Sequence, residues 1–153
     1  MRAAAIAGLT ALLLFVGLAV WLRPLDPDVL SLQLAFTPRQ FGDIVHAWSP
    51  GMLARYRAHL PIDFVLLACY GTFGHRLATH WSVLAAHRWA RGLLPAAAVC
   101  DAVENGFHLW LTEAPRFGVP WAYATSAGCA TLKWVLIVGY AGVVVRALLS
   151  PAR

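Results

Sequence analysis

Four long apolar runs alternate with shorter polar stretches along the chain. The runs cover residues 3–22, 61–80, 92–112 and 120–148. An α-helix needs about 20 apolar residues to cross the hydrocarbon core of a bilayer. The pattern therefore predicts an all-α membrane protein in which four transmembrane helices form an antiparallel bundle. We expect the whole chain, residues 1–153, to be one domain.

The first run has two interpretations, a retained membrane helix or a secretory signal peptide. It follows Arg2 and ends near Trp21, an aromatic residue of the kind found at membrane interfaces. Its length matches a full membrane span, and no A-x-A cleavage pattern closes it. We therefore expect a retained first helix.

The stretch 23–60 is the longest segment between two runs, and we expect it to be an extracytoplasmic loop. It begins with residues that break a helix, namely Pro24, Asp26, Pro27 and Asp28. Apolar residues then occupy every second position, at Leu30, Leu32, Leu34 and Phe36. This alternation predicts a short strand. A lone strand needs a pairing edge, so an extended segment laid on the bundle is the alternative.

Two helix starts follow within the same loop. In the first, Thr37 is a suitable N-cap, Pro38 stands at the first helical position and Gln40 at the capping-box position. Ser49 and Pro50 repeat the start. Both segments carry an apolar stripe, which predicts two short amphipathic helices that lie at the membrane interface or cover the bundle as a lid. A regulatory or partner-binding role is the alternative.

The composition agrees with a membrane protein and argues against a soluble domain or a nucleic-acid-binding protein. The chain is 60% hydrophobic and 12% charged, whereas soluble domains carry about 25% charged residues. The net charge of +5 comes from arginines that are dispersed among the apolar runs, so we expect no nucleic-acid partner. Each of the cysteines Cys69, Cys100 and Cys129 lies in a predicted span, and no two of them have CxxC spacing. We therefore expect no disulfide and no zinc site.

The arginines also predict the orientation. If both termini are cytoplasmic, the inner side carries Arg2, Arg76, Arg88, Arg91, Arg146 and Arg153. The outer side then carries Arg23, Arg39, Arg55, Arg57 and Arg116. Basic residues favour the cytoplasmic side. The acidic residues outside the spans would all lie outside, namely Asp26, Asp28, Asp43 and Glu113.

Polar side chains interrupt the third run at helical spacing. Asp101, Glu104, Asn105 and His108 stand at i, i+3, i+4 and i+7 and so share one face of a helix. Such groups are costly in hydrocarbon, so we expect this face to point into the bundle interior or a wet cavity.

Helix geometry predicts which other polar groups meet this face. With a rise of about 1.5 Å per residue, Lys133 of the fourth run reaches the depth of Asp101, with Glu104 one turn above. By the same count, Tyr70 falls near the level of Glu104 and Asp63 near that of His108. We expect Lys133 to face the two carboxyl groups, with Asn105, Tyr70 and Ser126 completing hydrogen bonds. One cation between two acids favours a proton that is shared or retained by one carboxyl group.

These polar residues have a structural and a functional interpretation. A network of Lys133, Asn105, His108, Tyr70 and Asp63 with the two acids would fix helix register or bind a ligand. Glu104 and Asp101 are the candidates for general acid–base catalysis. A metal held by Glu104 and His108 is conceivable, but helical di-iron proteins use i, i+3 pairs from two helices. We therefore expect no metal and no cofactor, and no catalytic or nucleotide-binding motif occurs.

Several segments together resemble a group of known sequences. The segments are LQLAFTPRQFGDIV, ARYRAHLPIDFVLLACYG, CDAVENGFHLWL and the lone Lys-Trp pair of the last run. They resemble small four-helix bacterial membrane proteins that have no assigned activity, which implies a bacterial inner-membrane location. The long first loop is also similar in topology to claudin-like four-span proteins, but the chain lacks their Gly-Leu-Trp and paired-cysteine loop signature.

The leading functional prediction is a small inner-membrane protein that is not an enzyme. Its polar core would organise the bundle, and it would bind a membrane lipid, a lipid-like small molecule, a second copy of itself or a partner membrane protein. The first alternative is an intramembrane enzyme acting on a lipid or isoprenoid, with Glu104 or Asp101 as general acid–base. The second is a component of proton-coupled transport.

Overall fold

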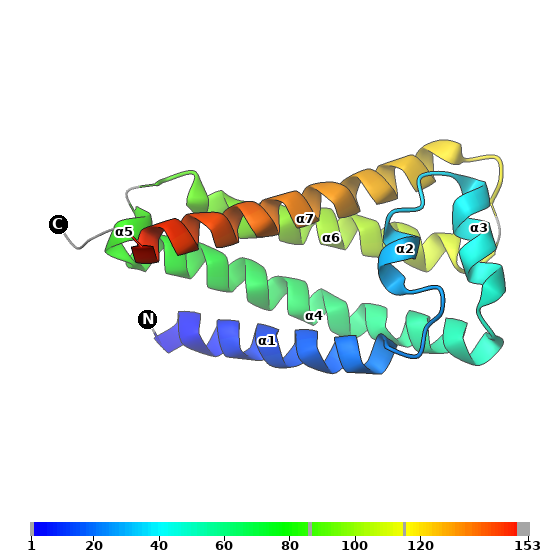
Figure 1. Cartoon of the computed structure of the whole chain (residues 1–153), viewed down its shortest axis with the longest axis horizontal. Coiled ribbons are helices and arrows are strands. Elements are labelled where there is room, and N and C mark those ends of the chain that lie inside the picture. Colours follow the sequence, from blue (N-terminus) through cyan, green and yellow to red (C-terminus); the bar gives the residue numbers. More distant parts are fainter. Residues whose placement is uncertain (1, 86, 115, 150–153) are drawn as a thin grey trace.

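The computed structural model describes residues 2–85, 87–114 and 116–149, and within these ranges it contains helices and no strand. Arg153, one of the inner arginines named above, lies outside them. Four long helices run side by side along the molecule (Figure 1): α1 (Arg2–Leu22), α4 (Pro50–His80), α6 (Ala90–Leu111) and α7 (Pro120–Leu149). Helix α1 packs on α4, α4 on α6, and α6 on α7. The all-α prediction is confirmed.

The predicted strand is wrong, because helix α2 (Val29–Gln33) occupies that segment. Asp28 is its N-cap, and the carboxylate accepts hydrogen bonds from Ser31 N at 2.8 Å and Ser31 Oγ at 2.7 Å. These bonds lower the pKa of Asp28 below its ordinary value. A single helical turn satisfies backbone groups locally, whereas a lone strand would leave them unpaired. The alternation persists only as burial of Leu32, while Leu30 and Leu34 are exposed.

The first predicted amphipathic helix is confirmed as α3 (Pro38–Ala47). Thr37 Oγ1 accepts a hydrogen bond from Gln40 N at 3.2 Å. The helix crosses the loop end of the long helices (Figure 1). Phe41 is buried there in one apolar cluster with Leu111 and Tyr123. The helix therefore covers this end of the molecule.

The second predicted short helix is not separate. It begins as expected, since Ser49 Oγ accepts from Met52 N at 3.3 Å, but it continues through Pro61 to His80 as one helix, α4. A proline inside a helix removes one main-chain hydrogen bond. Apolar side chains on both sides of Pro61 compensate by packing, because Tyr56, Leu60 and Leu66 are all buried.

Two glycines allow α4 and α6 to approach closely. A Cβ atom at Gly74 would lie 2.5 Å from Leu94 Cβ, and one at Gly71 would lie 3.1 Å from Ala98 Cβ. The carbonyl of Gly74 also accepts a hydrogen bond from the Tyr140 hydroxyl at 3.1 Å, so α7 is tied to the same point. The short helix α5 (Ser82–Ala85) follows α4 at this end.

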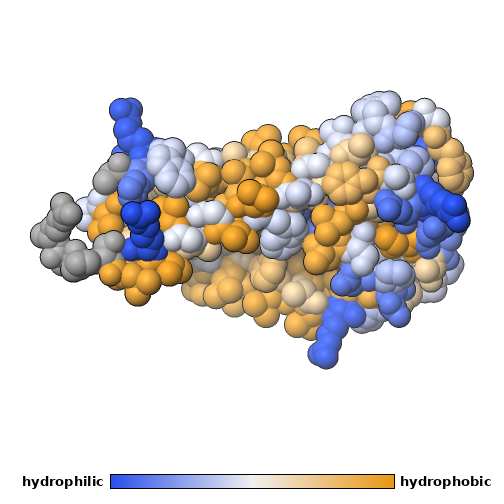
Figure 2. Space-filling view, turned by 45° about the horizontal axis from the view of Figure 1, so that its top comes forward, coloured by the Kyte–Doolittle hydropathy of each residue, from blue (hydrophilic) through white to orange (hydrophobic). Residues whose placement is uncertain are grey.

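Two helices, α1 and α7, are long and apolar enough to cross a membrane. A signal sequence, or the core helix of a soluble protein, has similar length and composition. However, only 11% of the most apolar stretch of α1 and 17% of that of α7 are buried, so neither is a core helix of this molecule. Figure 2 shows apolar side chains over the middle of the visible face and hydrophilic ones near both ends.

Candidate functional site

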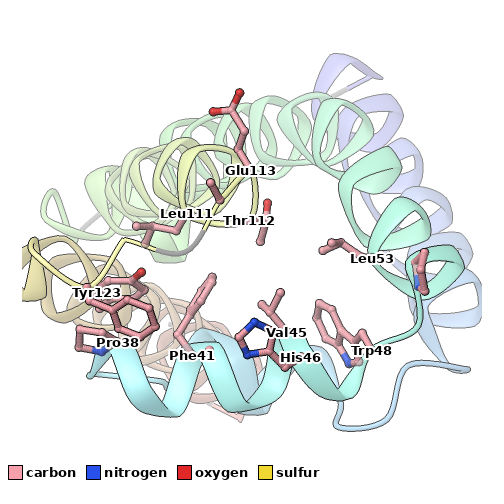
Figure 3. A pocket seen from close by; sticks show the side chains of 14 residues that line it. Pro38, Phe41, Val45, His46, Trp48, Leu53, Leu111, Thr112, Glu113 and Tyr123 are labelled. Atoms are coloured by element: carbon pink, nitrogen blue, oxygen red, sulfur yellow. The ribbon is translucent and has the colours of Figure 1, made fainter.

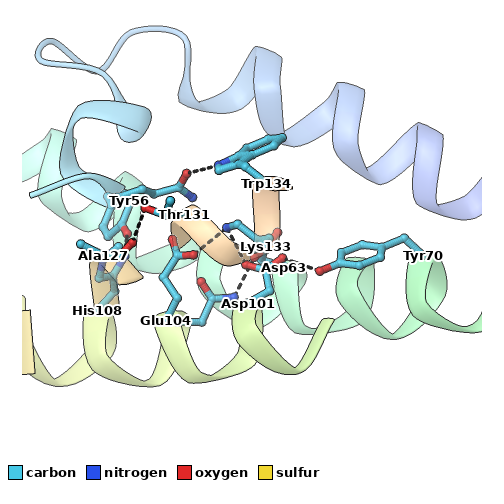
Figure 4. Close-up of polar contacts among 12 residues, drawn as sticks. Tyr56, Asp63, Tyr70, Asp101, Glu104, His108, Ala127, Thr131, Lys133 and Trp134 are labelled. Carbon is cyan, nitrogen blue, oxygen red and sulfur yellow. Dashed lines mark hydrogen bonds and ion pairs between the residues drawn. The ribbon is translucent and has the colours of Figure 1, made fainter. Parts of the chain in front are cut away.

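The centre of the molecule holds an ion cluster of three side chains, Asp101, Glu104 and Lys133 (Figure 4). Lys133 Nζ lies 2.9 Å from Asp101 Oδ1 and 2.7 Å from Glu104 Oε2. The exposed fractions of the three residues are 5%, 0% and 4%, in the order named. The predicted meeting of Lys133 with both acids is confirmed. Helices α6 and α7 position the cluster because their contacts bring the residues to the same depth.

Helix α4 contributes the next group of polar contacts. The Tyr70 hydroxyl donates to Asp101 Oδ2 at 3.0 Å, and Asn105 Nδ2 donates to Asp63 Oδ2 at 2.7 Å. Both α4 residues therefore sit about one turn from their predicted levels. The two offsets have the same direction, which corresponds to a shift of α4 along its axis by one turn. Depth counted from residue 61 missed this shift because the helix begins at Pro50.

His108 extends the stripe but does not join the ion cluster. Its Nδ1 lies 2.5 Å from the Tyr56 hydroxyl, and its ring stacks at a tilt against Phe41, with centroids 5.5 Å apart. His59 in turn contacts the Tyr56 carbonyl. The sequence indicated Tyr56 only as part of an apolar stripe. Nothing in the sequence near Tyr56 pointed to His108, which is 52 residues away.

Three buried oxygen atoms lack a hydrogen-bond partner among the described residues: Glu104 Oε2, which forms the ion pair with Lys133, and two more. One is Glu104 Oε1, the oxygen of that carboxyl group that does not pair with Lys133. The other is Ser126 Oγ, so Ser126 does not complete the network as predicted. Two carboxyl groups share one ammonium group in the ion cluster, and a proton on either of them would make it neutral. Within the described ranges, no three His, Cys, Asp or Glu side chains are placed to hold a metal ion.

The loop segment reaches the level of the ion cluster. Trp134, next to Lys133 in α7, donates from Nε1 to Gln33 Oε1 at 3.2 Å. Helix α2 therefore packs beside α7 at this level. Sequence reasoning missed this contact because Gln33 was assigned to a strand in the loop.

A cavity of about 330 Å³ lies between α3 and the loop ends of α4 and α6 (Figure 3). Phe41, Val45, Leu53, Leu111 and Tyr123 give it a mostly apolar lining. The polar side chains in its lining include those of His46, Thr112 and Glu113. No pattern in the sequence predicted this cavity. The only signal was the apolar stripe of the loop helices, which line one of its walls.

A single layer of side chains separates the cavity from the polar interior. Phe41 lines the cavity and also contacts the ring of His108. Asp101, Glu104 and Lys133 are not among the lining residues. Helix α4 also holds the end of α6 that lies beside the cavity. Arg57 Nη1 of α4 donates to Leu109 O at 3.0 Å and to Thr112 Oγ1 at 2.8 Å.

Comparison with known proteins gave no match: no family model, no curated protein and no solved structure matches this chain.

Proposed function

We propose that the chain is a small integral protein of the bacterial inner membrane and that all four of its long helices cross the membrane. The support is the packing order, since α4 and α6 lie lengthwise between α1 and α7, the two helices able to cross. A bilayer around α1 and α7 would therefore also surround the pair between them. In this proposal both termini are cytoplasmic, the orientation in which Asp26, Asp28, Asp43 and Glu113 all lie on the extracytoplasmic side.

The function that the geometry supports best is binding of an amphipathic, lipid-like molecule in the cavity under α3. The observation that carries this proposal is the mostly apolar cavity of about 330 Å³, whose lining includes a few polar side chains. Ligand sites of small molecules are typically apolar, of roughly 300–1,000 Å³, with a few polar groups that orient the ligand. The apolar wall would hold a chain, and His46, Thr112 and Glu113 would contact a polar head.

In this proposal the ion cluster organises the helices and does not touch the ligand. Its residues are buried, and they join α6 to α7 directly and α4 through Tyr70. Buried polar contacts between helices of this kind can fix register. The cluster would thereby hold the end of α6 in place, and that end forms one wall of the cavity.

A photo-crosslinking experiment tests the binding proposal. The purified full chain in a mild detergent is irradiated with a fatty acid that carries a diazirine group, and the labelled residues are mapped by mass spectrometry. We expect labels on α3 and at the ends of α4 and α6. The Val45→Trp variant places an indole in the cavity and should reduce these labels.

The matched control is Val138→Trp on α7, where the side chain is 67% exposed and far from the cavity. It should leave the cavity labels unchanged. Labels confined to the exposed faces of α1 and α7, or labels on α3 that survive in Val45→Trp, would refute the proposal.

A second candidate is an intramembrane enzyme that acts on a lipid or isoprenoid. One observation favours it, namely that Glu104 Oε1 is buried beside Lys133 without a hydrogen-bond partner among the described residues. A carboxyl oxygen with a spare lone pair is what a general acid–base requires. Glu104→Gln keeps the shape of the side chain and removes the titrating group. A lipid conversion that is absent from Glu104→Gln but present in the normally folded parent would support the enzyme. Equal conversion by both would exclude it.

A further inference from the structure

The end of the molecule opposite the loop holds a second cavity, of about 350 Å³. It lies where α7 passes the connector between α5 and α6. Arg146 and His87 line it together with Trp89, Val143 and two glycines of α7, Gly139 and Gly142. The cavity therefore combines a cationic side, an aromatic side and an open apolar floor. The ion cluster and the loop-end cavity are both elsewhere in the molecule.

The charge at this end has one sign. Arg76, Arg88 and Arg146 are exposed near the cavity or on neighbouring turns. Residues 64–100 and 114–149 contain no aspartate and no glutamate. Figure 2 shows hydrophilic side chains projecting at this end of the molecule. An anionic group would thus be attracted to this end, where residues 64–100 and 114–149 place no aspartate or glutamate side chain.

The floor of the cavity continues into the apolar face of α7. No heavy atom lies within 4 Å of a Cβ position at Gly139 or Gly142, so both positions leave open space. The neighbouring residues Val138 and Val145 are 67% and 53% exposed. A flexible chain lying over the glycines would therefore remain in contact with apolar surface. Trp89, 59% exposed, stands at the rim, as aromatic residues do at membrane interfaces.

We propose that this cavity binds one anionic phospholipid of the inner leaflet, with the headgroup phosphate at Arg146 and His87 and an acyl chain along Gly139 and Gly142. Basic pockets beside membrane helices on the cytoplasmic side are suited to anionic headgroups. A free phosphate ion would use the cations but not the apolar floor. The inference rests on the proposed membrane insertion and its orientation, and not on the ligand of the loop-end cavity.

The test measures lipid binding by native mass spectrometry of the purified full chain in a non-ionic detergent. Phosphatidylglycerol and phosphatidylcholine with identical acyl chains are titrated separately. We expect phosphatidylglycerol to bind at least about fivefold more tightly, the effect of one nearby arginine. The Arg146→Gln/His87→Gln variant should lose this preference. Gly142→Leu, which fills the floor, should weaken binding of phosphatidylglycerol.

Two matched controls separate a site from general charge or glycine effects. Arg39→Gln removes an exposed arginine at the opposite end, and Gly128→Leu fills an open glycine position elsewhere on α7. Both should keep the preference. Equal binding of the two lipids by the parent, or a preference that survives Arg146→Gln/His87→Gln, would overturn the inference. Displacement of the lipid by an equal concentration of inorganic phosphate would do so as well.

Flotation with phosphatidylcholine vesicles tests membrane insertion separately. A chain that floats with these vesicles but shows no preference for the anionic lipid refutes only the lipid site. A chain that does not float refutes the proposed membrane insertion together with the site.

Discussion

The ammonium group of Lys133 lies 2.7 Å from Glu104 Oε2, and the side chains are 5% and 0% exposed. Removing one partner of a buried ion pair leaves an uncompensated charge, which typically costs about 3–5 kcal/mol. The ion cluster contains a second acid, Asp101, so the loss of its only cation affects two carboxyl groups. Replacing Lys133 alone should therefore destabilise the fold more than replacing all three residues of the ion cluster together.

We predict that Lys133→Met lowers the free energy of unfolding by about 3–5 kcal/mol. The measurement is reversible unfolding in mixed micelles followed by tryptophan fluorescence. Arg39→Met is the matched control, because Arg39 and Asp43 form an ion pair with side chains that are 92% and 74% exposed. Its cost should stay below about 1 kcal/mol. Adding Glu104→Met and Asp101→Leu to Lys133→Met should recover most of the loss, and failure to do so would contradict this account.

The close contact of α4 with α6 gives a second prediction. Gly74→Ala should lower the free energy of unfolding by about 1–3 kcal/mol, because its Cβ would lie 2.5 Å from Leu94 Cβ. Leu94→Ala should not rescue the variant, since alanine retains the colliding atom. Gly128→Ala on α7 meets no atom within 4 Å and should stabilise the helix by about 0.5–1 kcal/mol. Equal effects of the two substitutions would show that packing at Gly74 is not decisive.

Features that depend on regular helix geometry could be predicted from the sequence. The rise per residue is fixed, so the shared depth of Lys133 and Asp101 followed from counting along two spans. The same count misplaced Tyr70 and Asp63 by one turn, because the true start of α4 precedes Pro61. A proline at the start of an apolar run indicates a helix start, but packing of the neighbouring side chains allows α4 to continue through Pro61.

Two kinds of feature could not be predicted: segments where a strand and a helical turn compete locally, and sites formed by segments that are distant in the sequence. Alternating apolar residues predicted a strand at 30–36, yet the Asp28 cap with Ser31 stabilises a helical turn there. The strand would have required a partner that the described chain does not offer. The loop-end cavity is formed by residues from separate segments, such as Val45, Leu53 and Leu111, and the second cavity joins residues 83–89 to residues 139–147, so no local pattern predicts either.

The cap of α2 gives a prediction about pH. The hydrogen bonds from Ser31 lower the pKa of Asp28 from its ordinary value of 3.8. A carboxyl group with a depressed folded pKa stabilises the fold above its unfolded pKa, and this stability is lost as the pH falls through the lower folded value. We predict that protection of the Leu32 and Leu34 amides against hydrogen exchange is constant above about pH 4 and declines below it.

Asp28→Ala should remove this pH dependence and cost about 1 kcal/mol, the usual value of an N-cap. Asp28→Asn is the matched variant, because it retains a capping oxygen without a titrating group. It should keep protection at neutral pH and show no decline in acid. The same acid-induced decline in Asp28→Asn would assign the effect to another group.

The contact of Tyr56 with His108 gives the last prediction. Tyr56 is 1% exposed and His108 is also 1% exposed, so water cannot replace a lost hydroxyl. Tyr56→Phe should therefore cost about 1–3 kcal/mol, the penalty for an unsatisfied buried polar group. Tyr140→Phe is the matched control, because the carbonyl of Gly74 that its hydroxyl contacts is part of a regular helix and keeps a main-chain partner. Its cost should be closer to about 0.5–1.5 kcal/mol. In a double-mutant cycle, Tyr56→Phe should cost little once His108→Leu has removed the hydrogen-bond partner of the hydroxyl. Additive losses would mean that the Tyr56 hydroxyl acts independently of His108, and that the wall between the loop-end cavity and the polar interior is held without this hydrogen bond.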